Sequence, residues 1–446
     1  MRLLALVLVF ASACSFDASV GFGVGGGGDV VDVAGIRLVF ADESATSLSI
    51  WTRDSTGAWS ESERTPALPG PARFVRSAVV GSVELVGAWI DGSPGQLVML
   101  SRQSGGEWVE DWRLQVDSVP DGARPFDLIA ATDGRGVLVS SDGDGTPSYR
   151  VWNDGWSAAL EMPLTGTRFD WFELAASPVG MGIALAAGES DGQLHVIDFL
   201  DDSWQADSTR LLTSDLKRGV DGGVQSPSFD LEFRDGGGLV VCFGEGSESR
   251  HGARCRIRGP SMTGFFPLEF SRTPWGYVTG VSLASHPGRN WLAGGFFDLE
   301  ENERLGAITW KNMAVEDGGE LDSELRNDND VRSGSIPGAA AWSGDIAAVV
   351  YADSEAQRLP WAQWTEAGGW SLPAAPERSN LGRLESVVGF TDSDSGDAVF
   401  AISDDSGSLF VESFDGSVWT TENGGPLSTE LSTVPGAPFA LHRISR

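Results

Sequence analysis

The chain has 446 residues, of which 41% are hydrophobic. That is enough apolar material for a sizeable core, and it excludes wholesale disorder. There are 63 Asp and Glu against 31 Lys and Arg, a formal net charge of −32 that repels phosphate backbones, so nucleic acid is excluded as an expected partner.

The first 13 residues predict an export signal. Arg2 supplies the positive charge, residues 3–10 are apolar, and residues 11–13 form a small-residue cleavage site. The apolar stretch is too short to span a bilayer, which takes roughly 20 helical residues. Cys14 follows directly, and this arrangement resembles the bacterial lipoprotein signal, in which the cysteine is lipidated and becomes the new N-terminus. Cleavage by ordinary signal peptidase fits the same small residues.

By the same resemblance, Ser15 after Cys14 implies a lipoprotein of the outer membrane, on its periplasmic or its outer side. Residues 14–29 then form the lipidated cysteine and a Gly-rich tether, which behaves as a flexible chain. Residues 30–446 remain for a folded domain.

From residue 30 onward the sequence repeats itself. Tryptophans that follow a Gly, Asp or Ser turn recur at intervals of about 50 residues, a period typical of propellers. They are Trp59, Trp108, Trp156, Trp204, Trp370 and Trp419. The long gap after Trp204 holds two further repeats without this tryptophan, which end near Phe265 and Val315. Because its place in the repeat is fixed, the tryptophan is expected to pack between repeats.

Each repeat contains four short apolar or alternating stretches separated by Gly and Asp turns, as in residues 126–156. Such stretches predict strands, and four strands per unit of about 50 residues predict the blades of an all-β propeller. We count eight blades. Seven is the alternative, because the repeats between 205 and 369 are irregular.

The C-terminal stretch 439–444 predicts a strand with no partner next to it in the sequence. The first repeat has a second strand at 36–42 but only a poor inner strand before it. We therefore expect the terminal strand to complete the first blade and close the ring like a velcro fastener, which removes free sheet edges.

By architecture, residues 30–446 resemble exported bacterial β-propeller lipoproteins. This resemblance implies a monomeric, lipid-anchored binding or assembly scaffold of the cell envelope, with an unidentified protein, peptide or glycan as its partner. The alternative is an extracellular carbohydrate-active enzyme of the sialidase or glycosidase kind, which would need an arginine cluster with a tyrosine and a glutamate.

No catalytic residue can be assigned from the sequence. The tyrosines at 149, 277 and 351 stand in no evident catalytic context, and the four histidines fall in different repeats without metal-binding spacing. There is no Gly-x-Ser-x-Gly motif, and no pairing of Cys with His. We therefore expect a binding protein rather than an enzyme, without a cofactor.

The loops between the second and third strands are rich in acidic residues, and in a propeller these loops share one face. Asp is a good turn former, but Glu is not, so turn chemistry does not account for all of them. The predicted acidic face, which would bind a basic partner or a cation, comprises Asp42, Glu43, Asp91, Asp142, Asp144, Glu189, Asp191, Glu245, Glu248, Asp298, Glu300, Glu301, Glu303, Asp353, Glu355, Asp404 and Asp405. Calcium is an open alternative at 141–145 and 392–397, where carboxylates alternate as in oxygen-ligand loops.

Two further cysteines predict a disulfide. Cys242 ends the second strand of the fifth repeat and Cys255 begins the third, at nearly equal distances from the loop between them. They should therefore face each other across an antiparallel pair, at a spacing that a disulfide can bridge. An exported protein meets the oxidising conditions that the bond needs.

Overall fold

Strands make up most of the regular structure. The structure, a computed structural model, describes residues 35–444 except 43–45, 55–56, 91, 93, 117–122, 143, 167, 181, 217–227, 248–249, 261, 269–277, 299–303, 312–313, 323–335, 354 and 432–437, and it gives the backbone alone for 247, 250–251, 304, 314–320, 322 and 443–444. The described residues belong to one compact unit, Val33–Arg446. Across these ranges, no helix has the length and apolar character needed to cross a membrane. The predicted signal, Cys14 and the tether lie outside the described residues.

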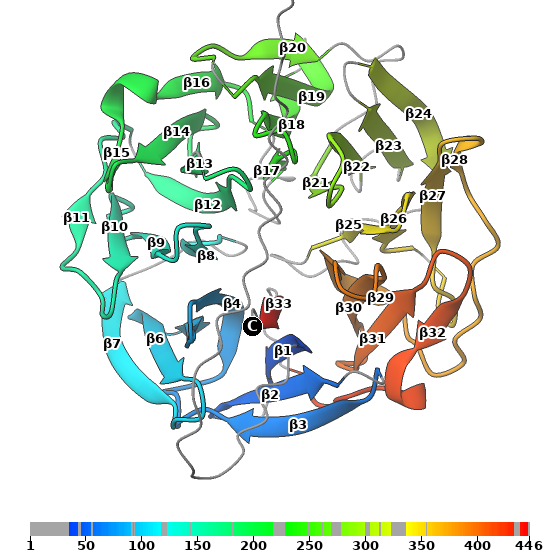
Figure 1. Ribbon diagram of the computed structural model, residues 1–446, viewed down its shortest axis with the longest axis horizontal. Coiled ribbons are helices and arrows are strands. Elements are labelled where there is room, and N and C mark those ends of the chain that lie inside the picture. Colours follow the sequence, from blue (N-terminus) through cyan, green and yellow to red (C-terminus); the bar gives the residue numbers. More distant parts are fainter. Residues whose placement is uncertain are drawn as a thin grey trace, which may run out of the picture. The chain divides into compact units, whose positions relative to one another are not determined.

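The strands form eight antiparallel sheets, which stand as blades around a common axis (Figure 1). This confirms the predicted eight-bladed all-β propeller, and the seven-bladed alternative is wrong. From the inner to the outer strand, blades 1 to 4 are β33 (Phe439–Ile444), β1 (Gly35–Ala41), β2 (Leu48–Arg53), β3 (Trp59–Arg64); β4 (Ala72–Val80), β5 (Val83–Ile90), β6 (Gly95–Gln103), β7 (Val109–Val116); β8 (Phe126–Ala130), β9 (Gly136–Ser141), β10 (Pro147–Trp152), β11 (Leu160–Glu161); and β12 (Phe169–Ala176), β13 (Ile183–Glu189), β14 (Leu194–Leu200), β15 (Ser203–Trp204).

The second half of the ring repeats this order. Blades 5 to 8 are β17 (Phe229–Phe233), β18 (Leu239–Ser247), β19 (Arg250–Arg258), β20 (Phe266–Leu268); β21 (Gly280–Ser285), β22 (Trp291–Asp298), β23 (Arg304–Lys311), β24 (Ala314–Asp322); β25 (Gly338–Ser343), β26 (Ile346–Tyr351), β27 (Trp361–Thr365), β28 (Gly369–Ser371); and β29 (Leu384–Thr391), β30 (Ala398–Asp404), β31 (Leu409–Phe414), β32 (Trp419–Thr421).

The hydrophobic core lies between the blades. The second strands read as nearly continuous apolar runs because both of their faces are covered, and every residue of β5 is buried. Apolar clusters join neighbouring blades, such as Val39 of blade 1 with Val86 of blade 2. Trp59 and Trp108 belong to such clusters, which confirms the predicted packing role of the repeated tryptophan at these two positions.

Blade 1 is built from both ends of the described chain. The inner strand β33 pairs antiparallel with β1, from Gly35 opposite Ile444 to Phe40 opposite Phe439. The predicted closure of the ring by the C-terminal strand is therefore confirmed.

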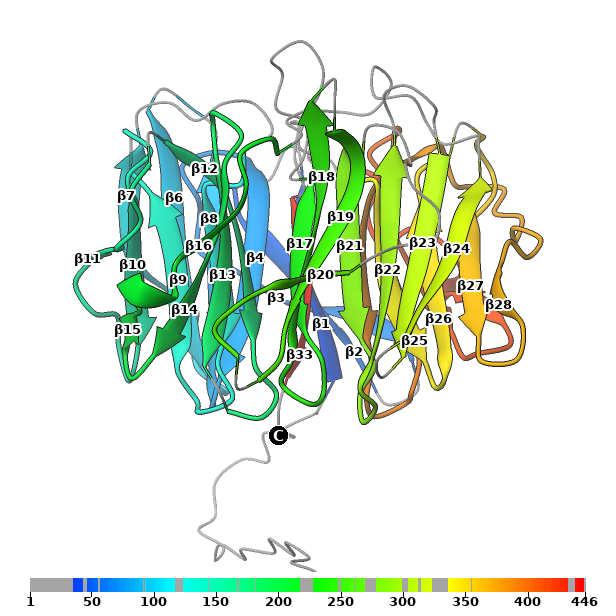
Figure 2. The same ribbon diagram turned by 90° about the horizontal axis from the view of Figure 1, so that it is seen from above.

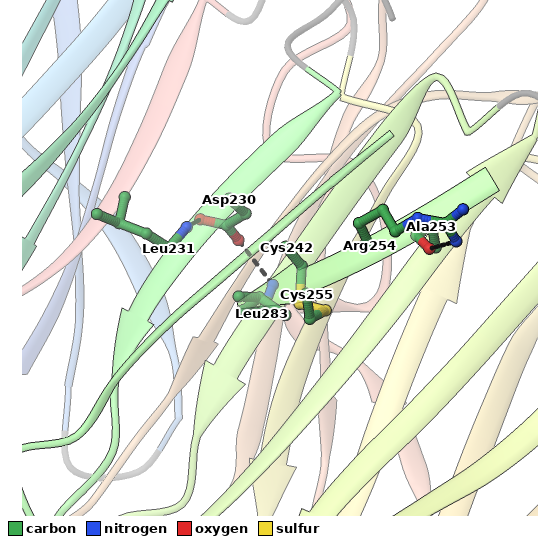
Figure 3. Close-up of a disulfide and its surroundings, with 7 residues drawn as sticks. All are labelled: Asp230, Leu231, Cys242, Ala253, Arg254, Cys255 and Leu283. Atoms are coloured by element: carbon green, nitrogen blue, oxygen red, sulfur yellow. Dashed lines mark hydrogen bonds between the residues drawn. A yellow bond between two sulfur atoms is a disulfide. The ribbon is translucent and has the colours of Figure 1, made fainter. Parts of the chain in front are cut away.

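Blade 5 contains the predicted disulfide. Cys242 of β18 lies directly opposite Cys255 of β19, with their Cα atoms 4.0 Å apart (Figure 3). Both side chains are fully buried, and the bond joins the second and third strands of the blade.

Blade 4 departs from the four-stranded plan. Its outer strand β15 has only two residues, and a 3-10 turn, η1 (Ala206–Ser208), follows it. The chain then forms a fifth strand, β16 (Arg210–Thr213), which also pairs with β14. The extra segment lies at the outer rim of the ring (Figure 1).

Candidate functional site

The turns between third and fourth strands open on one face of the ring. Because the strands of every blade alternate in direction in the same order, the second-to-third loops lie together on the opposite face. Figure 2 shows β18 and β22 rising to that opposite face, at the top of the view. The two faces therefore carry different sets of residues.

An arginine marks the third strand in three successive blades. Arg53, Arg102 and Arg150 stand near the ends of β2, β6 and β10, each six residues before the repeated tryptophan of its blade. In each case the tryptophan indole N–H donates to a carboxylate that lies on or next to the outer strand of the preceding blade. These tryptophan–carboxylate pairs are Trp59 with Glu422, Trp108 with Glu63, and Trp156 with Asp111.

In the groove between blades 1 and 2, the arginine, tryptophan and carboxylate of this pattern border a cavity. A cavity of about 560 Å³ lies there, lined by Glu63, Arg64, Thr65, Pro66, Arg102, Gly105, Gly106, Glu107 and Trp108. The indole Nε1 of Trp108 donates to Glu63 Oε2 at 2.8 Å, and Arg102 Nη1 donates to Glu63 Oε1. The guanidinium of Arg102 lies over the Trp108 ring, 5.5 Å from its centre. The Glu63 side chain keeps 27% of its surface exposed and can accept further hydrogen bonds.

A buried network of ion pairs holds the Arg102 guanidinium in place. Its Nη2 donates to Glu84, whose other carboxylate oxygen lies 3.1 Å from Arg37 Nη1. Burial raises the pKa of Glu84, but the imidazole of His442, 3.9 Å away, and the guanidinium groups of Arg37 and Arg102 outweigh burial and bring this pKa below its ordinary value. The charges of Arg37 and Arg102 balance those of Glu63 and Glu84. These ion pairs fix the Arg102 guanidinium at the cavity.

The neighbouring grooves, between blades 8 and 1 and between blades 2 and 3, contain related side-chain pairs. Between blades 8 and 1, Arg53 Nη2 lies 2.7 Å from Glu422 Oε1, but the Glu422 side chain is only 3% exposed, so its carboxylate is closed to solvent. Between blades 2 and 3, Trp156 Nε1 donates to Asp111 Oδ2 at 3.0 Å, and burial raises the pKa of Asp111. The guanidinium of Arg150 lies over the Trp112 ring instead of pairing with that carboxylate.

The sequence analysis missed these arginines and carboxylates. The available signal was the constant spacing of six residues between arginine and tryptophan in three successive repeats. The carboxylate at three or four residues after the tryptophan of the preceding repeat completes the pattern, as at Glu63, Asp111 and Glu422. An ion pair across two repeats becomes visible only once the blades are placed side by side.

The residues of the predicted acidic face have different surroundings. Glu189, Glu245, Asp298, Asp353 and Asp404 are buried at or near the ends of second strands. Several of these pair locally: Glu189 lies 2.7 Å from His195, Glu245 pairs with Arg254, and Asp353 pairs with Arg358.

The other described acidic residues reach solvent to different degrees. Asp42 and Asp405 are partly buried, while Asp142, Asp144, Asp191 and Glu355 are exposed. Glu43, Asp91, Glu248, Glu300, Glu301 and Glu303 lie outside the described residues. A ligand of this face stays a prediction.

The two candidate calcium loops bind their own backbone. Asp142 Oδ1 accepts the N–H groups of Asp144 and Thr146 at 3.0 and 2.8 Å, and Asp392 Oδ1 accepts that of Asp394 at 3.1 Å. Among the residues that the structure describes, no three His, Cys, Asp or Glu side chains are grouped as metal ligands would be. Calcium binding stays a prediction.

A second cavity of about 260 Å³ lies among the inner strands at the axis. Blades 2 to 5 line it with Arg76, Arg124, Glu173, Asp230 and Glu232, whereas blades 6 to 8 and blade 1 contribute mainly apolar residues. Burial and the repulsion of Glu173 raise the pKa of Asp230 well above its ordinary value. Burial raises the pKa of Glu232 to about 7, and also that of Asp127, which pairs with Arg76.

The fold is shared with solved β-propellers. BP39L lectin from Burkholderia pseudomallei is similar to this chain with a TM-score of 0.50 and 12% sequence identity, over 79% of this chain and 99% of the lectin. Aleuria aurantia lectin, solved in complex with alpha-methyl-L-fucoside, gives a TM-score of 0.37 and 13% identity, over 69% of this chain and 95% of the lectin.

A putative 6-phosphogluconolactonase from Bacteroides uniformis gives a TM-score of 0.47 and 11% identity, over 78% of this chain and 96% of that protein. No protein-family model and no curated protein matches the sequence. At these identities the likeness shows the propeller fold alone. Since a fold can host unrelated functions, the function has to be argued from the site.

Proposed function

We propose that this protein is a non-catalytic, glycan-binding β-propeller whose main site is the groove between blades 1 and 2. The observation that carries the proposal is the arrangement of Arg102, Glu63 and Trp108 around an open cavity. Sugar hydroxyls both donate and accept hydrogen bonds, so an arginine fork beside a carboxylate satisfies them, while Trp108, buried between the blades, holds Glu63 in place through its indole N–H.

The size and rigidity of the groove support this proposal. Its volume of about 560 Å³ falls in the range of small-molecule sites, roughly 300–1,000 Å³. Arg102 is fixed in advance by Glu84, so binding does not have to order that side chain. The likeness to BP39L, a lectin, adds support at the level of fold.

The enzyme alternative finds less support. It calls for arginine, glutamate and tyrosine together in one cavity. Tyr149 and Tyr351 belong to the packed clusters between blades, and neither lines the groove of blades 1 and 2 or the axial cavity.

The location and the acidic face are further parts of the proposal. The sequence of residues 1–29 supports an outer-membrane lipoprotein anchored through Cys14. A second candidate function is a scaffold that holds a basic partner on the acidic face, and the exposure of Asp142, Asp144, Asp191 and Glu355 favours it. The face with the groove of blades 1 and 2 would then bind a glycan, and the opposite, acidic face would bind a basic partner.

The test is a glycan array with the purified mature protein, followed by calorimetry on the best ligand. Arg102→Lys and Trp108→Phe should each weaken binding about 10-fold or more, because each leaves a sugar hydroxyl or Glu63 without its partner. The matched controls are Arg113→Lys, at an exposed arginine, and Trp419→Phe, at the equivalent tryptophan of blade 8; both should bind as the parent does. Equal affinity of all four variants would contradict the proposed site.

A further inference from the structure

A third cavity, of about 530 Å³, lies in the groove between blades 4 and 5. It opens where the third strands β14 and β19 end, on the same face as the groove of blades 1 and 2. Its lining includes Asp198, Leu200, Gln205, Phe233, Arg258 and Met262. These residues place a polar pair and an apolar wall in one cavity.

The extra segment of blade 4 builds one wall of this groove. Gln205 Nε2 donates to the backbone oxygens of Leu200 and Ser203 at 2.9 and 3.0 Å. Ser208 Oγ donates to the Gln205 oxygen at 2.8 Å and accepts the Asp198 N–H at 3.0 Å. The 3-10 turn is thereby bound to β14, so the wall is a fixed part of the fold.

The second groove, like the first, contains an arginine paired with a carboxylate from the neighbouring blade. Here the arginine, Arg258, comes from blade 5 and the carboxylate, Asp198, from blade 4. Arg258 donates through both Nη atoms to the two oxygens of Asp198, at 2.6 and 2.5 Å, across the blade boundary. Asp198 stands six residues before Trp204, where blades 1 to 3 have their arginine. The guanidinium of Arg258 lies over the Phe265 ring, 5.2 Å from its centre, whereas that of Arg102 lies over an indole ring.

The apolar wall has no counterpart in the first groove. Leu200 is 39% exposed and Met262 is 54% exposed, and both line the same cavity together with Phe233. The first groove is lined instead by two glutamates, two arginines, a threonine and two glycines besides its proline and tryptophan. The two grooves therefore suit ligands of different polarity.

We propose that the groove between blades 4 and 5 is a second saccharide site, selective for N-acetylated sugars. This inference rests on the proposed glycan-binding function. Ring hydroxyls of the sugar would bridge Arg258 and Asp198, and the acetamido methyl group would contact Leu200 and Met262. An unsubstituted hexose would place a hydroxyl against that wall and leave it without a hydrogen-bond partner, which costs binding free energy.

The test uses the full mature protein with Arg102→Lys and Trp108→Phe combined, so that the first groove is disabled. Calorimetry or ligand-observed NMR then compares N-acetylglucosamine and N-acetylgalactosamine with glucose and galactose. We expect the acetylated sugars to bind about 10-fold more tightly, as expected for one methyl-sized contact. Met262→Gln, a change at an exposed side chain that should leave folding intact, should remove most of this preference.

Each outcome decides between the two sites. If the disabled protein binds none of the four sugars, or binds them equally, the inference is overturned, while glycan binding by the parent protein still supports the first groove. If the disabled protein binds acetylated sugars and the Arg102 and Trp108 changes have no effect on the parent, the first groove is wrong and the second stands. Adding Arg258→Lys to the disabled protein should abolish its remaining binding with the melting temperature unchanged, and undiminished binding would overturn the second groove.

Discussion

Phe40 of β1 lies directly opposite Phe439 of β33, so one ladder joins the first and last described strands of the chain. Both phenylalanines are buried in the cluster between blades 8 and 1. The stability of the ring therefore depends on a contact between segments at opposite ends of the propeller sequence.

Deleting residues 438–446 should lower the melting temperature and broaden the transition. The loss of Phe439 alone should cost about 3–5 kcal/mol in the free energy of unfolding, and the exposed edge of β1 should promote aggregation. Calorimetry and light scattering check this. Deleting only residues 445–446 is the control, and an unchanged transition in the longer deletion would contradict the closure.

Reduction of the Cys242–Cys255 bond should destabilise blade 5. The bond closes a loop with a sequence separation of 13, for which the chain-entropy model gives up to about 3 kcal/mol. Urea unfolding with and without reductant measures the difference. Thiol counting on the unreduced, denatured protein should find both cysteines blocked, and two free thiols there would refute the bond.

Glu84→Gln should reduce both stability and glycan affinity. It leaves Arg37 and Arg102 short of a buried counter-charge, and breaking such a pair costs about 3–5 kcal/mol. Glu110→Gln, which removes an exposed pair with Arg113, is the control and should cost about 0–1 kcal/mol. If Glu84→Gln binds the array ligand as the parent does, Glu84 does not position Arg102.

Stability should fall as the pH rises from about 4 to about 7. The carboxyls of Asp127 and Glu232 have pKa values of about 7 in the folded protein, and that of Asp230 is also raised, so the folded state binds more protons than the unfolded state over this range. Each group contributes a slope of at most about 1.4 kcal/mol per pH unit. Urea midpoints across the range measure the slope.

Glu232→Gln is the matched test of this pH dependence. The amide oxygen of the new glutamine side chain can still accept a hydrogen bond from Ser285. The free energy of unfolding of the variant should therefore fall less steeply with pH, by the contribution of one titrating group, and exceed that of the parent above pH 7. An identical slope in parent and variant would show that Glu232 is ionised throughout.

Cys14→Ala should release the protein from membranes, because we expect lipid on this cysteine to be the anchor. Fractionation of cells into soluble and membrane parts, with an antibody to the propeller, checks this. Ser15→Ala, beside the cysteine, is the control and should stay in the membrane fraction. Membrane retention of Cys14→Ala would contradict the lipoprotein proposal.

The architecture was predictable because each blade repeats local patterns. Tryptophan spacing located the repeats, and the unpaired stretch at Phe439 located the closure. The pairing of Cys242 with Cys255 followed from their equal distances to one loop. The fifth strand of blade 4 was not predictable, since β16 reads like any other short alternating stretch and its pairing with β14 depends on the turn at Ala206–Ser208.

The candidate site was less accessible to sequence reasoning. Acidic loops were the more visible signal, yet Asp353 and Asp404 prove to be buried, where both accept hydrogen bonds near their own loops. The groove of blades 1 and 2 combines Glu63 with Arg102, residues from different repeats whose contact depends on how two sheets pack. Local composition carries no information on that packing.

The pairing of β1 with β33 also determines the order in which the blades can form during synthesis of the chain. When β1 leaves the ribosome, its partner is still about 400 residues from being made, a delay on the order of 20 to 80 s at about 5–20 residues per second. During this interval blades 2 to 8 can assemble in sequence, while the first blade has to wait with one edge open. For the export that we propose, this order keeps the ring open until the last residues of the chain have been made.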